Sequence, residues 1–162
     1  MPGMASASSN LDAGGNPGGY RCGSPRRAGE GLRIGVARHA PRGVRREDRA
    51  RLGHFDLWLP LLAPSPALLR AYKHEGLSFA AFARRYRTEM RAPACRQVIA
   101  LLAGLARELR FSLGCPCADP ERCHRSLLRA LIADAARELP SEPPPRRRLT
   151  SPVCLANWED ES

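Results

Sequence analysis

The chain has 162 residues and a formal net charge of +10. A length of this order fits one domain with terminal extensions. The sequence has no apolar run near the roughly 20 residues that span a bilayer, so we expect no membrane partner. Residues 1–30 contain no apolar stretch typical of a secretory signal. We therefore expect a cytoplasmic protein whose six cysteines stay reduced and do not form a disulfide framework.

The positive charge is carried almost entirely by arginine, since Lys73 is the only lysine. Residues 33–51 and residues 84–110 each hold seven arginines against two acids, a net of +5 per stretch. A folded domain this basic favours a nucleotide or a nucleic acid as its partner. The alternative is a solvated arginine-rich surface, which needs no ligand.

In chain order, the first predicted element is a strand at 32–37, where apolar residues alternate with others. Three helices follow from their start signals. Ser65 with Pro66 is a capping residue followed by a proline at the first helical position, and Ser78 and Pro93 begin two further apolar stripes at helical spacing.

A second strand is predicted around 111–113, and Asp119 with Pro120 is expected to begin the last helix. Further strands are expected to lie within residues 45–62. The order of strand, helices, strand and helix predicts a small single α/β domain, with a short, mostly parallel sheet covered by helices.

This domain is expected to occupy residues 32–139. The flanking segments are rich in Gly, Ser, Pro or Arg and have few large apolar residues. We therefore predict a disordered N-terminal extension at 1–31 and a disordered C-terminal tail at 140–162.

Residues 114–126, Gly-Cys-Pro-Cys-Ala-Asp-Pro-Glu-Arg-Cys-His-Arg-Ser, carry three of the six cysteines where a strand is followed by a helix. Ligands of open α/β sheets bind beyond the carboxyl ends of the strands, and a helix N-terminus offers free N–H groups there. This segment is therefore the candidate functional site.

The interpretation we favour is binding of a phosphate-bearing ligand, a nucleotide or nucleic acid. Its binding residues would be Arg42 from the first loop together with His124, Arg125 and Ser126. Arginine and a helix N-terminus together suit phosphate oxygens, and this interpretation requires no reactive thiol.

The second interpretation is a thiol-dependent enzyme. Its nucleophile would be Cys117 or Cys123, activated by the helix N-terminus and nearby arginines, with His124 as general acid or base. The sequence does not name a reaction, so catalysis itself stays an open question.

Zinc is a third option, with Cys115, Cys117, Cys123 and His124 as candidate ligands. Their spacing differs from the familiar paired Cys-x-x-Cys, so zinc is not favoured and the cofactor is left open. The three cysteines are also compatible with simple core packing. A regulatory interaction protein and an unspecified oligomeric state are further alternatives.

Three ordered blocks of sequence resemble a known family. They are Cys123–Leu128 preceded by Cys117, the Pro-Arg-Gly at 41–43, and Leu61–Leu68 followed by Phe82–Met90. Over about residues 32–139 the chain resembles the YeaO-like branch of the bacterial domain-of-unknown-function family 488. The resemblance implies a cytoplasmic bacterial α/β domain with Cys-His-Arg at a strand-to-helix junction, and it implies no reaction.

Overall fold

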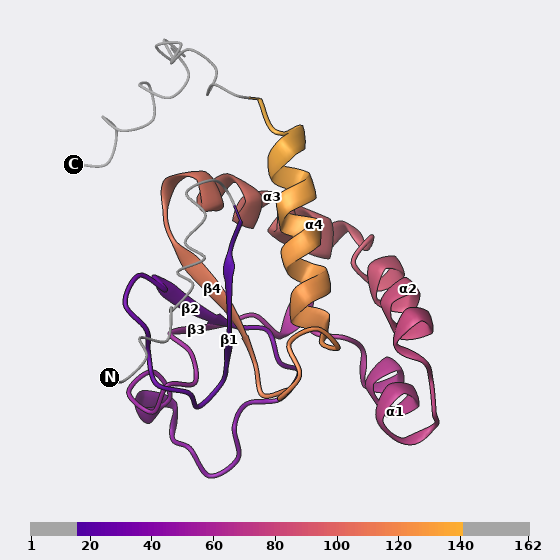
Figure 1. Ribbon diagram of the computed structural model, residues 1–162, viewed down its shortest axis with the longest axis horizontal. Helices are drawn as coiled ribbons and strands as arrows, with labels where there is room; N and C mark the ends of the chain where they lie inside the picture. The colour runs from indigo at the N-terminus through magenta and orange to yellow at the C-terminus, as the bar shows by residue number, and fades with distance from the viewer. Residues whose placement is uncertain (1–15, 141–162) are drawn as a thin grey trace, which may run out of the picture.

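The computed structural model describes residues 16–140 as a four-stranded sheet with α-helices packed against it (Figure 1). The strands are β1 (Gly18–Arg21), β2 (Leu32–Gly35), β3 (Leu57–Trp58) and β4 (Phe111–Cys115). The helices are α1 (Pro66–His74), α2 (Phe79–Glu89), α3 (Pro93–Glu108) and α4 (His124–Glu138), with 3-10 turns at Arg46–Asp48 and Pro60–Leu62. The strand order is β1-β4-β2-β3 and every pairing is parallel, which confirms the predicted α/β class.

The fully buried strand β4 lies in the middle of the sheet and separates two differently covered faces. On one face Phe111 and Leu113 join the apolar core that the helices complete. On the other face Gly114 lies against the ring of Tyr20, which leaves no space for a Cβ atom there. Because side chains alternate along a strand, Cys115 shares the helix-covered face with Phe111 and Leu113.

The predicted helix starts are confirmed for three helices. The Ser65 hydroxyl oxygen accepts the Leu68 N–H at 3.1 Å, and Ser78 accepts the Ala81 N–H at 3.2 Å. Pro93 opens α3 as expected. None of the helices in the described part of the chain is long and apolar enough to cross a membrane.

The predicted N-terminal boundary at residue 32 is wrong. Residues 18–21 form β1, and all four pair with β4 from Ser112 to Cys115, so the domain begins well before β2. Three of the four strand residues carry no apolar side chain, and only Tyr20 is buried, so the alternation used to find strands is missing. Residues 1–15 of the predicted extension and residues 141–162 of the predicted tail lie outside the described residues.

The start of the last helix is also corrected. The predicted Asp119 cap instead accepts the N–H groups of Glu121 at 2.9 Å and Arg122 at 3.3 Å within the preceding loop. Helix α4 begins four residues later, with Cys123 as its N-cap and His124 as its first residue. An Asx turn therefore stands where the first helical turn was predicted. Cys123 and His124 consequently lie at the very start of α4 and not within its second turn.

Strands β2 and β3 also refine the prediction. β2 ends at Gly35 rather than at residue 37. The strand expected within 45–62 is β3, which pairs through Leu57 and Trp58 with the end of β2. Since all strands are parallel, β1, β2 and β4 present their carboxyl ends at one edge of the sheet, the edge that leads into α4.

Candidate functional site

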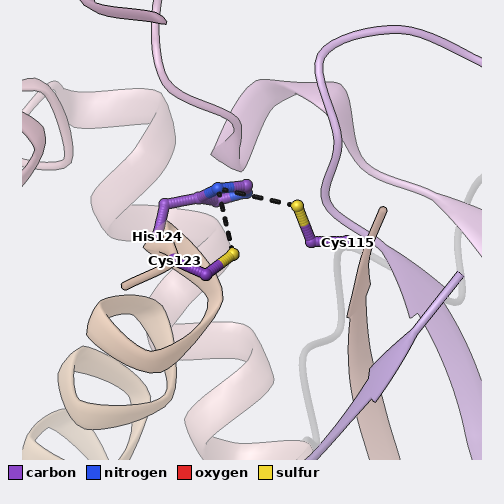
Figure 2. A group of neighbouring side chains, drawn as sticks. All are labelled: Cys115, Cys123 and His124. Atoms are coloured by element: carbon purple, nitrogen blue, oxygen red, sulfur yellow. Dashed lines mark hydrogen bonds between the residues drawn. The ribbon is translucent and has the colours of Figure 1, made fainter. Parts of the chain in front are cut away.

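Two thiols and an imidazole meet in the interior at the carboxyl edge of the sheet (Figure 2). Cys115 ends β4, while Cys123 and His124 form the cap and first residue of α4. All three are buried, and their potential ligand atoms lie within 4.8 Å of one another. The His124 Nδ1 atom is 3.8 Å from the Cys123 Sγ and 4.0 Å from the Cys115 Sγ.

The orientation of His124 follows from one strong hydrogen bond. Its Nε2–H donates to the carbonyl oxygen of Val36, directly after β2, at 2.8 Å. A carbonyl can only accept, so the proton lies on Nε2 and Nδ1 presents a lone pair to the two sulfurs. Burial lowers the pKa of His124, and the hydrogen bond to Val36 only partly opposes this effect. The ring is therefore neutral at neutral pH and can accept a proton.

Cys117 adds a third sulfur to this cluster, and it is the accessible one. Its Sγ lies 3.3 Å from the Cys115 Sγ, and the residue is half-buried, whereas Cys115 and Cys123 are buried. Hydrogen bonds from the thiols of Cys115 and Cys123 lower the pKa of Cys117 to about 2 and outweigh burial, which would raise it.

The other two thiols change in the opposite direction. The pKa of Cys115 is raised, chiefly by its hydrogen bond with Cys117 and then by that with Cys123 and by burial. For Cys123 the hydrogen bond with Cys115 lowers the pKa, but the one with Cys117 and burial outweigh it and raise the pKa to about 11. The directions of these three shifts favour the thiolate on the half-exposed Cys117, with the buried thiols of Cys115 and Cys123 as S–H donors to it.

The four candidate metal ligands are thus brought close to one another. Cys115, Cys123 and His124 are the residues best placed to hold a thiophilic cation such as zinc, with Cys117 beside Cys115. The Val36 carbonyl orients the imidazole in the way that outer partners commonly do in metal sites. The same atoms are equally suited to thiol chemistry, so the geometry supports both kinds of site.

The predicted phosphate-binding residues are not all in one place: Arg125 and Ser126 share a pocket, and Arg42 lies outside it. Arg125 is buried and donates to the carbonyl of Tyr20, which ties α4 to β1. The Ser126 hydroxyl donates to the Cys123 carbonyl at 2.7 Å. Both residues line a pocket of about 70 Å³ beside β1, whereas Arg42 is exposed in the loop after β2 and is not among that pocket's lining residues.

One cysteine near the site was missed from the sequence. Cys22 directly follows β1, and its N–H donates to the Cys115 carbonyl at 3.1 Å, so it lies at the same sheet edge. Burial raises its pKa, with smaller opposing effects from Tyr20 and Arg125. Recognising β1 was the only route to Cys22, since no motif surrounds it.

A parallel sheet with a thiol–imidazole cluster at its carboxyl edge defines this protein as a small α/β domain with a cysteine-centred site. The model of the "Active DUF488-N3 subclade" matches residues 19–136, so the chain belongs to the DUF488 family. The matched region begins inside β1, in agreement with the corrected domain boundary. The YeaO-like branch stays a prediction. No curated protein and no solved structure matches the chain significantly.

Proposed function

We propose that this DUF488 domain is a thiol-dependent enzyme in which Cys117 is the nucleophile. The observation that carries this proposal is the position of its sulfur, half-exposed at the sheet edge and 3.3 Å from the buried Cys115 Sγ. Nucleophilic cysteines combine access for a substrate with groups that stabilise the thiolate. Cys117 has both.

The structure favours Cys117 over Cys123, the other candidate from the sequence. Cys123 is only 2% exposed, and its carbonyl accepts two hydrogen bonds from Ser126 in the first turn of α4. A substrate reaching that sulfur would have to open the start of the helix. His124, with its Nδ1 lone pair toward the sulfurs, is placed as a proton acceptor within the cluster rather than as a group that contacts solvent.

One further fact supports this proposal. The matching subclade is described as active, which fits an enzyme. We extend the proposal to the cytoplasm as the location, because a reducing compartment keeps thiols free.

The test is site-selective alkylation of the full chain with iodoacetamide at pH 5, followed by peptide mass spectrometry. A thiol of ordinary pKa, about 8.5, is ionised to less than about 0.1% at this pH. We expect Cys117 to be modified first, well before Cys22 and Cys95. The Cys117→Ser variant should lose this low-pH labelling, while the matched variant Cys95→Ser, which removes a buried thiol on α3, should keep it.

The proposal fails if the labelling at pH 5 is absent or is unchanged in Cys117→Ser. It also fails if protein purified without added metal contains about one zinc per chain and chelation alone exposes the thiols, since the sulfurs would then serve a structural metal.

A second candidate function is binding of a phosphate-bearing ligand, a nucleotide or nucleic acid. The observation in its favour is the small pocket beside β1, which is lined by Arg125, Ser126 and Arg129 at the first turns of α4. Arginine side chains at a helix N-terminus suit phosphate oxygens. Arg42 would contribute from the loop after β2.

The measurement for this second function is fluorescence anisotropy of a labelled oligonucleotide, and of a labelled nucleotide, at low and at physiological salt. Binding through phosphates weakens linearly on a log–log plot against salt. Ser126→Ala and Arg42→Ala should each weaken binding at low salt, whereas Arg137→Ala, at the far end of α4, should not. No binding at low salt, or binding that is indifferent to salt, contradicts this candidate.

A further inference from the structure

The arrangement of Cys115 and Cys117 points beyond a single nucleophile. Their sulfurs are 3.3 Å apart, in direct contact, and a disulfide bond needs about 2.05 Å. Closing the bond therefore needs a movement of only about 1.3 Å, which side-chain rotation can supply.

The backbone between the two cysteines also permits a bond. Two residues separated by one other have Cα atoms at most about 7.6 Å apart, and disulfides occur at about 4.4–6.8 Å. The intervening Pro116 fixes its own φ angle, so little conformational freedom is lost when the ring closes. The pair is thus held close before any reaction occurs.

We propose that Cys117 and Cys115 are a nucleophile and a resolving cysteine that together reduce disulfide-bonded substrates. This inference rests on the proposed function, because it requires Cys117 to react first. It assigns that function a reaction, thiol–disulfide exchange, and a substrate class.

The two steps balance in atoms and electrons. In the first step the Cys117 thiolate attacks one sulfur of the substrate disulfide, an S–S bond forms to Cys117, and the other substrate sulfur leaves as a thiolate. In the second step Cys115 loses its proton and attacks the Cys117 sulfur, and the remaining substrate sulfur leaves as a thiolate. The substrate disulfide is reduced to two thiols, and the enzyme is left with a Cys115–Cys117 disulfide, which thiol reductants of the cell reverse by the same exchange.

His124 has a defined part in the second step. Its Nδ1 lone pair lies 4.0 Å from the Cys115 Sγ, and the Nε2–H bond to Val36 prevents the ring from presenting a proton there instead. The Cys115 proton can therefore transfer to Nδ1 as the sulfur attacks, and afterwards to a departing thiolate.

Cys123 is less suited to resolve the intermediate. It caps α4, and the Ser126 N–H and hydroxyl both bond to its carbonyl, at 3.1 and 2.7 Å. These bonds fix the Cys123 backbone at the start of α4, whereas the Cys115 Sγ is already in contact with the Cys117 Sγ at 3.3 Å. Cys115 lies at a strand end, directly before the loop that carries Cys117, so the resolving step is assigned to it.

The experiment treats the reduced full chain, in EDTA, with one equivalent of 5,5′-dithiobis(2-nitrobenzoate) as the probe disulfide. In the wild-type protein we expect two thionitrobenzoate anions per reagent molecule, no retained adduct, and a Cys115–Cys117 bond in the mapped peptides. In Cys115→Ser the adduct on Cys117 should persist at least about 100-fold longer, because the intramolecular attack is removed. Cys95→Ser, on α3, should resolve as the wild type does, and Cys123→Ser should still form the Cys115–Cys117 bond.

Each of the other possible outcomes contradicts one step of the proposal. A wild-type adduct that forms on Cys117 and persists disproves the resolving role and leaves Cys117 as a nucleophile. If the adduct resolves rapidly in Cys115→Ser but persists in Cys123→Ser, the resolving residue is Cys123 and not Cys115. Oxidation by hydrogen peroxide but not by the probe disulfide disproves the substrate class. If the wild type releases no thionitrobenzoate and Cys115→Ser forms no adduct on Cys117, both this inference and the proposed function are overturned.

Discussion

Two buried polar clusters lie on opposite faces of the same sheet and differ in how well they are satisfied. On the face away from the helices, all three guanidinium nitrogens of the fully buried Arg33 donate, in four hydrogen bonds of 2.8–2.9 Å to Glu30 and three backbone carbonyls, and the Tyr20 ring lies 4.3 Å away. On the helix face, the contacts of the three thiols and His124 Nδ1 are longer, at 3.3–4.0 Å.

This difference separates a structural cluster from a chemical one. Buried polar groups are normally bonded, and one whose bonds are complete has no capacity left for a ligand. The Arg33 cluster joins β2 to the loops around Ser24 and Gly53 and leaves nothing to react. The cysteine cluster keeps a lone pair and an accessible sulfur, so it can still form bonds.

The largest effect is expected from Arg33→Met. It removes the buried partner of Glu30 and the donor to the Ser24 and Pro25 carbonyls, and breaking such an ion pair costs about 3–5 kcal/mol of the free energy of unfolding. Urea denaturation measures this loss. Arg27→Met, an exposed position in the same loop, is the control and should change stability by less than about 0.5 kcal/mol. Equal effects of the two variants would mean that the Arg33 cluster is not structural.

A smaller loss is expected from Tyr20→Phe. The Tyr20 hydroxyl donates to the His54 carbonyl at 2.6 Å, and loss of such a bond costs about 1 kcal/mol, while the ring remains under Arg33. Tyr72→Phe is the matched control, because its exposed hydroxyl reaches the Arg122 carbonyl only at 3.5 Å. Thermal denaturation of both variants would show whether the satisfied cluster depends on each of its bonds.

Asp56, which bonds to the Arg33 N–H, should also make the free energy of unfolding depend on pH in the acid range. Burial alone would raise the pKa of Asp56, but hydrogen bonds from the Arg33 N–H and the Arg26 side chain outweigh burial and lower it. A lowered pKa in the folded state contributes stability above the ordinary value of about 3.9, and this contribution is lost as the pH falls through the folded-state pKa. The difference in unfolding free energy between wild type and Asp56→Asn should therefore shrink below about pH 4. A constant difference would contradict this expectation.

The smallest effect on stability is expected from Cys117→Ser. The residue is half-exposed and its sulfur contacts are weak, so the free energy of unfolding should change by less than about 0.5 kcal/mol while reaction with the probe disulfide is lost. Calorimetry and thiol labelling on one preparation measure both. If this variant destabilises the fold as much as Arg33→Met, the contrast between the two clusters is wrong.

Local signals in the sequence predicted the features that depend only on residues close together in the chain, such as the helix starts. Ser65 and Ser78 cap their helices through N–H groups three residues away, and a pattern of that range is visible in the chain itself. Asp119 shows the limit of such reasoning. The same side chain can cap a helix or close an Asx turn, and packing of the loop decided for the turn.

The sequence by itself determined the fold class and the segment that carries the candidate site, because helical periodicity and the grouping of Cys115, Cys117, Cys123 and His124 are properties of short stretches. Only the tertiary structure decided which sulfur is accessible, which tautomer His124 adopts, and that Arg33 is buried. Those properties depend on contacts between residues far apart in the chain, such as the bond from His124 to Val36 and the pairing of β1 with β4. No local pattern records such contacts, because their free energy comes from surfaces that meet only after the chain has folded.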